Sequence, residues 1–281
     1  MTDPPPDSFA ATMLRALEGK DLTCAYDLFN RGNAYAELGR HDDAIADYDR
    51  ANQVEPDYEG GMAWFNRGNS LLALGRRDEA LASYRRPVEI GSIEWGPYGN
   101  VGALLGQDGR HDEALAIYDA YLAMCAREGI ELDELGNAIV AAHVFRAGAL
   151  ARLGREDEAE QAIATALELD PSATTEQSVG DHYGPHLRRW ARALPHYQAS
   201  YAEEQDELIC TRLGLTLANL GRRDEALAML REAVAHDPAT VEVYARASWR
   251  ALLDDPSILD ELGAAPPPSP PSPSPPSPDE A

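Results

Sequence analysis

GRRDEALA occupies residues 75–82 and recurs without change at residues 221–228. Close variants begin at Gly39 (GRHDDAIA), Gly109 (GRHDEALA) and Gly154 (GREDEAEQ). The first glycines therefore stand at positions 39, 75, 109, 154 and 221, with successive steps of 36, 34, 45 and 67. A period near 34 is typical of stacked helix–turn–helix repeats. The step of 67 is one short of twice 34 and indicates a degenerate unit, whereas the step of 45 predicts an insertion of about 11 residues, or three extra helical turns.

Each unit is predicted to contain two helices, as residues 25–56 illustrate. Apolar or small residues recur at helical spacing on both sides of Gly39. Gly39 itself is suited to ending the first helix, because glycine adopts positive φ easily. Asp42 and Asp43 are expected to start the second helix as a cap and as partners of its dipole. Pro56 ends the unit. The repeated octapeptide is therefore interpreted as an interhelical corner and not as a catalytic loop.

Several features recur together at fixed places in these units. A glycine lies in the first helix at Gly32, Gly68, Gly102 and Gly214, with Ala147 in its place once. A small residue opens the second helix at Ala44, Ala80, Ala114, Ala159 and Ala226. A large residue follows at Tyr48, Tyr84, Tyr118, Ile163 and Leu230. A closing proline is present at Pro56, Pro171 and Pro238.

This pattern resembles the tetratricopeptide repeat family over about residues 25–240. The resemblance implies an all-α fold, a right-handed superhelical solenoid of helix–turn–helix repeats with five clear units and one degenerate unit. It also implies that the first helices line a concave groove. Pro87 departs from the pattern and is expected to kink or shorten its helix.

The repeat array is assigned to residues 25–253. It follows an N-terminal tail and short helix at 1–24. It contains a degenerate unit with an irregular first helix at 172–206 and ends in a capping helix at 240–253, which a solenoid needs to cover its exposed end. Residues 254–281 are acidic and then rich in proline and serine, which predicts a disordered tail. Its PxxP elements are suited to docking, but a solubilising role needs no partner.

Composition narrows the functional class. The formal net charge is −24 and no long basic run is present, so nucleic acid is not an expected partner. No signal peptide and no membrane-spanning stretch is recognisable, and Cys24, Cys125 and Cys210 form no CxxC pair. We therefore expect a cytoplasmic protein with reduced core thiols, no membrane partner and no cofactor; its oligomeric state is not predicted.

No catalytic motif is present, so the protein is not expected to be an enzyme. GxxxxGK[ST], GxSxG and HExxH are all absent. His182 and His186 have a spacing that suits a metal on a helix, with His196 further on, but Pro185 lies between the first two. Loop histidines are the favoured interpretation, and no metal site is predicted.

Asparagine recurs on the first helices. NRGN stands at 30–33 and again at 66–69, and Asn30, Asn66 and Asn100 occupy equivalent places. Asparagine both donates and accepts hydrogen bonds, so such a row can hold a peptide backbone without reading its side chains. It resembles the rows with which tetratricopeptide adaptors grip extended peptides. The alternative is that the asparagines only satisfy neighbouring helices.

The predicted partner-binding residues are therefore Phe29, Asn30, Asn33, Phe65, Asn66, Asn69 and Asn100. The two phenylalanines would supply apolar contacts, with core burial as the alternative. The basic residues of a terminal-carboxylate clamp are missing: the corresponding places hold Phe29, Met62, Phe65, Gly96 and Asn100. The primary hypothesis is an adaptor that binds an extended segment of a partner protein with some positive charge.

An alternative hypothesis is a regulatory sensor that binds a small peptide or metabolite in the third to fifth units. The groove places there hold small residues, namely Gly99, Ala103, Gly106, Val144, Gly148 and Ala151. Small side chains would deepen the groove for a bulky apolar ligand group, or would only allow the helices to pack more closely.

Overall fold

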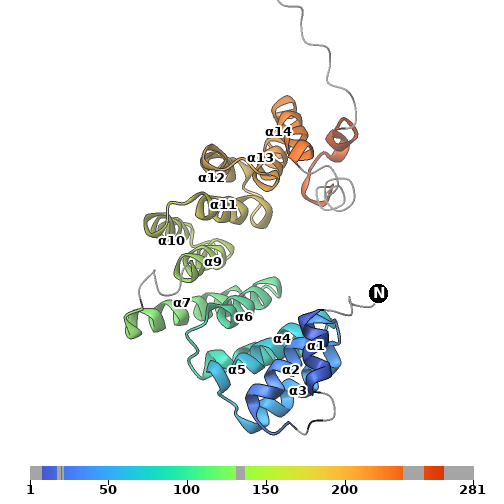
Figure 1. The fold of residues 1–281 in the computed structure, drawn as a ribbon. Coiled ribbons are helices and arrows are strands. Elements are labelled where there is room, and N and C mark those ends of the chain that lie inside the picture. Colours follow the sequence, from blue (N-terminus) through green and yellow to red (C-terminus); the bar gives the residue numbers. More distant parts are fainter. Residues whose placement is uncertain (1–7, 18–19, 21, 131–136, 237–249, 263–281) are drawn as a thin grey trace, which may run out of the picture. The chain divides into compact units, whose positions relative to one another are not determined.

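The computed structural model describes residues 8–17, 20, 22–130, 137–236 and 250–262 (Figure 1). Regular secondary structure in these ranges is entirely helical. The elements are α1 (Phe9–Leu17), α2 (Ala25–Glu37), α3 (His41–Val54), η1 (Tyr58–Gly60), α4 (Met62–Ala73), α5 (Arg77–Glu89), α6 (Trp95–Gln107), α7 (His111–Glu128), α9 (Ala138–Arg152), α10 (Glu156–Leu169), α11 (Ala173–Asp181), η2 (His182–His186), α12 (Trp190–Glu203), α13 (Glu207–Asn219), α14 (Arg223–His236) and η4 (Pro256–Asp260).

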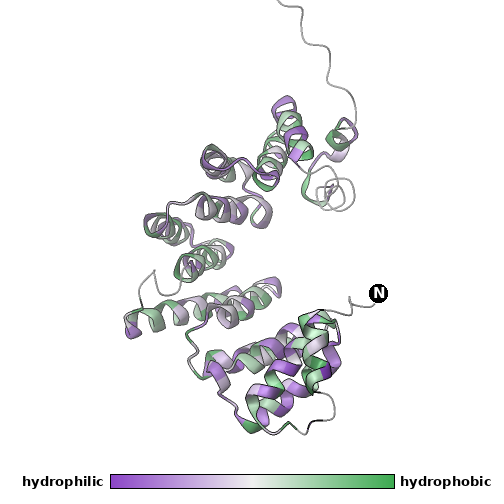
Figure 2. Ribbon diagram, in the orientation of Figure 1, coloured by the Kyte–Doolittle hydropathy of each residue, from purple (hydrophilic) through white to green (hydrophobic). Residues whose placement is uncertain are grey.

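Successive helices pack as pairs. The described pairs are α2/α3, α4/α5, α6/α7, α9/α10, α11/α12 and α13/α14. Hydrophilic and hydrophobic residues both occur along these helices, as expected when one face of each is buried (Figure 2). The protein divides into two compact units, residues 1–171 and 172–281. The all-α fold of stacked helix pairs that the repeats predict is confirmed.

The repeated octapeptide forms the corner within each pair. Gly39 has φ 72°, and the backbone N–H groups of Gly39 and Arg40 donate to Ala36 and Tyr35 at 2.9 and 2.8 Å. These bonds satisfy carbonyls at the end of the first helix, and the positive φ turns the backbone. The other four corner glycines have φ between 73° and 75°: Gly75, Gly109, Gly154 and Gly221.

The expected capping by acids is wrong in detail. Arg40 is the N-cap of α3 and its side chain makes no capping hydrogen bond, while Asp42 and Asp43 lie in the first turn. There they suit the helix dipole, and Asp43 accepts a hydrogen bond of 2.8 Å from Arg40 Nε. Equivalent pairs join Arg76 to Glu79, Arg110 to Glu113, Arg155 to Glu158 and Arg222 to Glu225.

The glycine of each first helix makes room for the large residue of the second. A Cβ at Gly32 or Gly68 would lie within 2.6 or 2.5 Å of a Tyr48 or Tyr84 ring carbon. Both tyrosines are fully buried. Any larger residue would force the paired helices apart, so this contact explains why glycine recurs there.

The degenerate unit has a corner without glycine. Arg188 takes φ 54° and Arg189 is the N-cap of α12, so the two occupy the places of Gly39 and Arg40. The step from Gly154 to Arg188 is 34, and the step from Arg188 to Gly221 is 33. These two steps account for the interval of 67, and the hidden unit predicted from it is confirmed.

An insertion of a single position makes the first helix of that unit irregular. Gly180 packs against Tyr197, a step of 17 along the sequence, whereas the step from Gly32 to Tyr48 is 16. The helix absorbs the difference in η2, a π-helical turn that contains Pro185. A π-bulge is a single-turn widening of an α-helix and accommodates an insertion of this kind.

The insertion predicted in the third unit lies partly in residues 131–136, which are outside the described residues. The helix α7 has 18 residues and ends at Glu128, with Gly129 at φ 66°. Compared with the 14 residues of α3, the helix α7 is longer by about one turn. Near this end of α7, Met124 and Cys125 are buried in a cluster with Tyr98. The helix α5 continues through Pro87 to Glu89 and is one residue shorter than α3.

The C-terminal segment corrects the predicted start of the tail. Residues 240–249 of the expected capping helix and residues 263–281 of the expected tail lie outside the described residues. In residues 250–262, Leu253, Ile258 and Leu259 are buried against α13 and α14. Residues 254–262 therefore belong to the folded part of the protein. No described helix is long and apolar enough to cross a membrane.

Candidate functional site

The predicted asparagines lie on α2, α4 and α6, the first helices of three consecutive pairs. Asn69 is exposed and the other four are half-buried. Neighbouring pairs are linked through them, because Asn66 Nδ2 donates to Asn33 Oδ1 at 2.9 Å. We call this set of five residues, Asn30, Asn33, Asn66, Asn69 and Asn100, the asparagine row.

Two buried tyrosines of the second helices donate hydrogen bonds to members of the asparagine row. The hydroxyls of Tyr48 and Tyr84 each donate at 2.8 Å to the side-chain oxygen of Asn33 and Asn69. Burial raises the pKa of Tyr84, and a hydrogen bond with Asn100 opposes the rise. Asn33, Asn66, Asn69 and Asn100 therefore make hydrogen bonds within and between neighbouring helix pairs, as the structural alternative proposed.

A hollow of about 240 Å³ lies at the asparagine row. It is lined by Asn33, Ala36, His41, Tyr48, Asn66, Asn69 and Ser70. Of the lining residues, His41 has a buried Nδ1 with no hydrogen-bond partner among the described residues, and so does Nδ2 of Asn30, which belongs to the row but does not line the hollow. Unsatisfied groups of this kind are costly, so they favour a polar ligand or water at this place.

The two arginines of NRGN point to the second helices. Arg31 pairs with Asp47 at 2.6 Å, and Arg67 pairs with Asp49 at 2.6 Å and donates to Ser83. In NRGN, the arginine therefore forms an ion pair with the second helix of a pair, and the glycine leaves space for a tyrosine ring. Both asparagines belong to the asparagine row.

The predicted phenylalanines face inward. Phe29 is 9% exposed and packs against Tyr48 and Tyr58, with ring centroids 6.1 and 5.4 Å away. Phe65 is half-buried and packs against Tyr84 at 5.6 Å and over Gly96. Phe29 therefore belongs to the core of the first pair and is not available as a surface contact.

Phe145 on α9 stands at the next equivalent place of the row and packs with aromatic residues of α6 and α7, a feature that the sequence analysis missed. Phe145 is 45% exposed, and its ring lies 5.8 Å from Trp95 and 5.9 Å from Tyr118. Phe145 stands two places before Ala147, as Asn66 stands two before Gly68. Aligning the units by this glycine place would have located it. We call Trp95, Tyr118 and Phe145 the aromatic patch.

The expected deepening of the groove is wrong at Gly99. A Cβ there would lie 3.1 Å from the Trp95 ring, so this side chain fills the space that the small residue leaves. Val144 and Ala151 are buried and line no open surface. At Gly99, Val144 and Ala151 the small residues therefore allow close packing, whereas a Cβ at Gly106 would meet no atom within 4 Å. No described pocket lies at these positions to support the sensor hypothesis.

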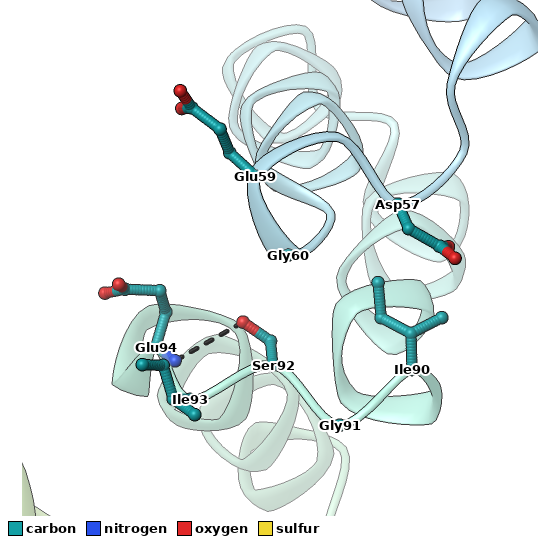
Figure 3. Close-up of a pocket in the computed structure, with 8 residues that line it drawn as sticks. All are labelled: Asp57, Glu59, Gly60, Ile90, Gly91, Ser92, Ile93 and Glu94. Carbon is teal, nitrogen blue, oxygen red and sulfur yellow. Dashed lines mark hydrogen bonds between the residues drawn. The ribbon is translucent and has the colours of Figure 1, made fainter.

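A second hollow, of about 440 Å³, lies between two loops of the compact unit formed by residues 1–171 (Figure 3). Asp57, Glu59 and Gly60 line it from the α3–α4 loop, and residues 90–94 line it from the α5–α6 loop. Ile90 and Ile93 expose apolar surface here. Sequence analysis did not find this site because its two loops lie in different repeat units and carry no motif.

The histidines of the degenerate unit are not in a loop as expected. His182 and His186 lie in η2, and His196 lies on α12. His196 Nδ1 is 2.7 Å from Glu176 Oε2, and its ring stacks on Tyr183. Among the cysteines, Cys125 and Cys210 are buried as predicted, but Cys24 is exposed.

The repeat pattern of one family matches most of the described helix pairs. Tetratricopeptide repeat patterns match residues 9–57, 29–92, 135–174 and 209–235. The chain belongs to the tetratricopeptide repeat family. None of the curated proteins matches the sequence.

Solved structures share the tetratricopeptide fold at low sequence identity. A repeat protein from Parabacteroides merdae is 17% identical with a TM-score of 0.59, over 87% of this protein and 88% of that one. PilW, a type IV pilus biogenesis factor, is 18% identical with a TM-score of 0.56, over 79% and 97%. A chain of the APC/C hetero-tetramer Cut9–Hcn1 is 17% identical with a TM-score of 0.52, over 87% of this protein and 46% of that one. Membership of the tetratricopeptide repeat family supports, in general terms, a role as a protein-interaction scaffold.

Proposed function

We propose that the protein is a non-catalytic adaptor that binds an extended segment of a partner protein along α2, α4, α6 and α9. The observation that carries the proposal is the continuity of the asparagine row with the aromatic patch. Five amide side chains are followed, at the equivalent place of the fourth unit, by Phe145, which is 45% exposed.

The chemistry of this surface defines the partner segment. Amide groups pair with backbone carbonyl and N–H groups, so they hold an extended peptide whatever its sequence. Trp95 and Phe145 offer apolar area of the kind that dominates binding energies at interfaces. The net charge of −24 disfavours an acidic segment. The expected ligand is therefore extended, carries at least one large apolar side chain, and is neutral or basic.

The test is affinity capture from the lysate of the source organism, with matched variants as bait. Asn66→Ala combined with Asn69→Ala removes two members of the asparagine row, and Phe145→Ala removes the exposed ring. The controls are Asn137→Ala, an exposed asparagine outside the row, and Phe9→Ala, whose ring is 79% exposed.

A partner that is retained by both controls and lost by both test variants supports the proposal. Circular dichroism and thermal melts establish that the variants keep their helices. Equal retention by all four proteins contradicts the proposal and directs the search to another surface, such as the acidic hollow of Figure 3.

A further inference from the structure

Three potential metal ligands lie close together where the helices α13 and α14 pack against each other. Cys210 lies on α13, and Glu232 and His236 lie one helical turn apart on α14. The thiol sulfur, a carboxylate oxygen and an imidazole nitrogen all lie within 4.8 Å of one another. Sulfur, nitrogen and oxygen donors from three side chains are the set from which zinc sites are built.

The carboxylate of this cluster is held in position. Tyr201 on α12 donates its hydroxyl to Glu232 Oε1 at 2.9 Å, which leaves the second oxygen as a ligand atom. Ligands of metal ions are commonly oriented by such outer hydrogen bonds. Cys210 is buried, Glu232 is half-buried and His236 is exposed. The cluster is therefore buried at Cys210 and accessible to solvent at His236.

Local charge favours a cation. Burial, followed by the negative charges of Glu232 and Asp206, raises the pKa of the Cys210 thiol. Nearby guanidinium groups are engaged elsewhere, because Arg212 pairs with Asp181 and Arg231 donates to the Glu261 carbonyl. A divalent ion would neutralise this cluster, and the thiol proton would pass to solvent as the thiolate binds the metal.

We propose that Cys210, Glu232 and His236 bind a zinc ion through sulfur, oxygen and nitrogen, with the fourth coordination position open to water. The ion ties α13 to the last turn of α14 and stabilises this helix pair. This proposal does not depend on the proposed binding of a partner along α2, α4, α6 and α9.

The test uses the full-length protein, freed of metal with a chelator. Isothermal titration with zinc is expected to show one ion bound per molecule. Cobalt titration is expected to produce the sulfur-to-cobalt charge-transfer band that reports a thiolate ligand. Cys210→Ser abolishes the band and His236→Ala weakens zinc binding at least tenfold. Tyr201→Phe, which removes only the outer hydrogen bond, weakens zinc binding about 10- to 100-fold.

Matched controls separate this site from adventitious binding. Cys24→Ser removes an exposed thiol and His111→Ala removes a histidine of a corner, and both should bind zinc and cobalt as the unsubstituted protein does. Absence of stoichiometric binding overturns the proposal. So does binding that is unchanged in His236→Ala, an exposed position whose substitution leaves the core intact.

Discussion

At the scale of single residues, Arg188 shows how the corner is made without its glycine. It adopts φ 54°, a left-handed conformation that costs an L-residue about 1–2 kcal/mol. Its guanidinium pairs with Asp254, but both side chains are more than half exposed, so the pair contributes at most about 1 kcal/mol. The backbone strain is the larger of the two effects.

Arg188→Gly is therefore expected to raise the free energy of unfolding by about 0.5–1 kcal/mol, because glycine removes the strain. Urea denaturation followed by circular dichroism measures the change. Arg155→Gly is the control, since Arg155 has φ −89° and pairs with Glu158 at the surface. A loss of stability in Arg188→Gly equal to that of the control would show that the left-handed backbone is not strained.

His143 gives the protein a pH dependence near neutrality. Burial, followed by the charge of Arg146, lowers the pKa of His143, and its Nδ1 has no partner among the described residues. The unfolded protein then binds the proton more readily. The stabilisation is complete above the ordinary histidine pKa of about 6.5 and decreases as the pH falls from there towards the lowered value.

We expect the free energy of unfolding to decrease between about pH 7.5 and pH 5.5 and to decrease less in His143→Gln. Urea denaturation at both values measures this. Carboxylates paired with arginine, such as Glu79 and Glu158, have lowered pKa values and lose their stabilisation at more acidic pH. An identical pH dependence in His143→Gln would assign the effect to other groups.

At the scale of the elements, the C-terminal segment 250–262 completes the core of α13 and α14. Leu259 is 2% exposed, and Asn219 donates to the Leu252 carbonyl and accepts from the Asp254 N–H. Arg223 adds contacts with Asp255 and Glu261. The apolar face of a terminal repeat needs such a cover to remain out of water.

Leu259→Ala is expected to destabilise the protein by about 2–5 kcal/mol, because it leaves a cavity in this core. The matched control is Leu208→Ala on α13, since Leu208 is 42% exposed and its loss should change stability by no more than about 0.5 kcal/mol. Thermal melts of both variants provide the comparison. Equal melting temperatures would mean that the segment does not stabilise the second unit.

The helix pairs were predictable because their signals are local. Corner glycines, apolar periodicity and the glycine–tyrosine spacing all lie within one repeat of about 34 residues. The irregular first helix near Pro185 was predictable as a break, but its π-helical form required the position of Arg188 at the corner. The packed segment after Asp254 was missed because its acids and proline resemble the tail that follows.

The candidate site was predictable only in part. The asparagine row follows from its register along the sequence, whereas the burial of Phe29 depends on contacts with Tyr58 in the next loop. Trp95 fills the space at Gly99 from within the same helix, which reverses the interpretation of a small residue. The meeting of Cys210 with Glu232 and His236 depends on the pairing of α13 with α14, and no local spacing reveals it.

At the scale of the whole molecule, charge sets the conditions for association. A net charge of −24 attracts a basic segment at long range, and dissolved salt screens this attraction. Association with a basic partner should therefore slow as salt is raised from about 0.05 M to about 0.5 M, while the dissociation rate changes less. Surface plasmon resonance with the captured partner measures both rates, and a salt-independent association rate would exclude electrostatic steering.

The account depends most on the claim that the first helices of the unit formed by residues 1–171 bind the partner. Hydrogen–deuterium exchange of the full-length protein, with and without the captured partner, tests it directly. We predict slower exchange in α2, α4, α6 and α9, and unchanged exchange at the solvent-facing positions of α3, α5 and α10. Protection confined to the second helices, or to the loops around Glu59 and Ile93, would contradict the claim.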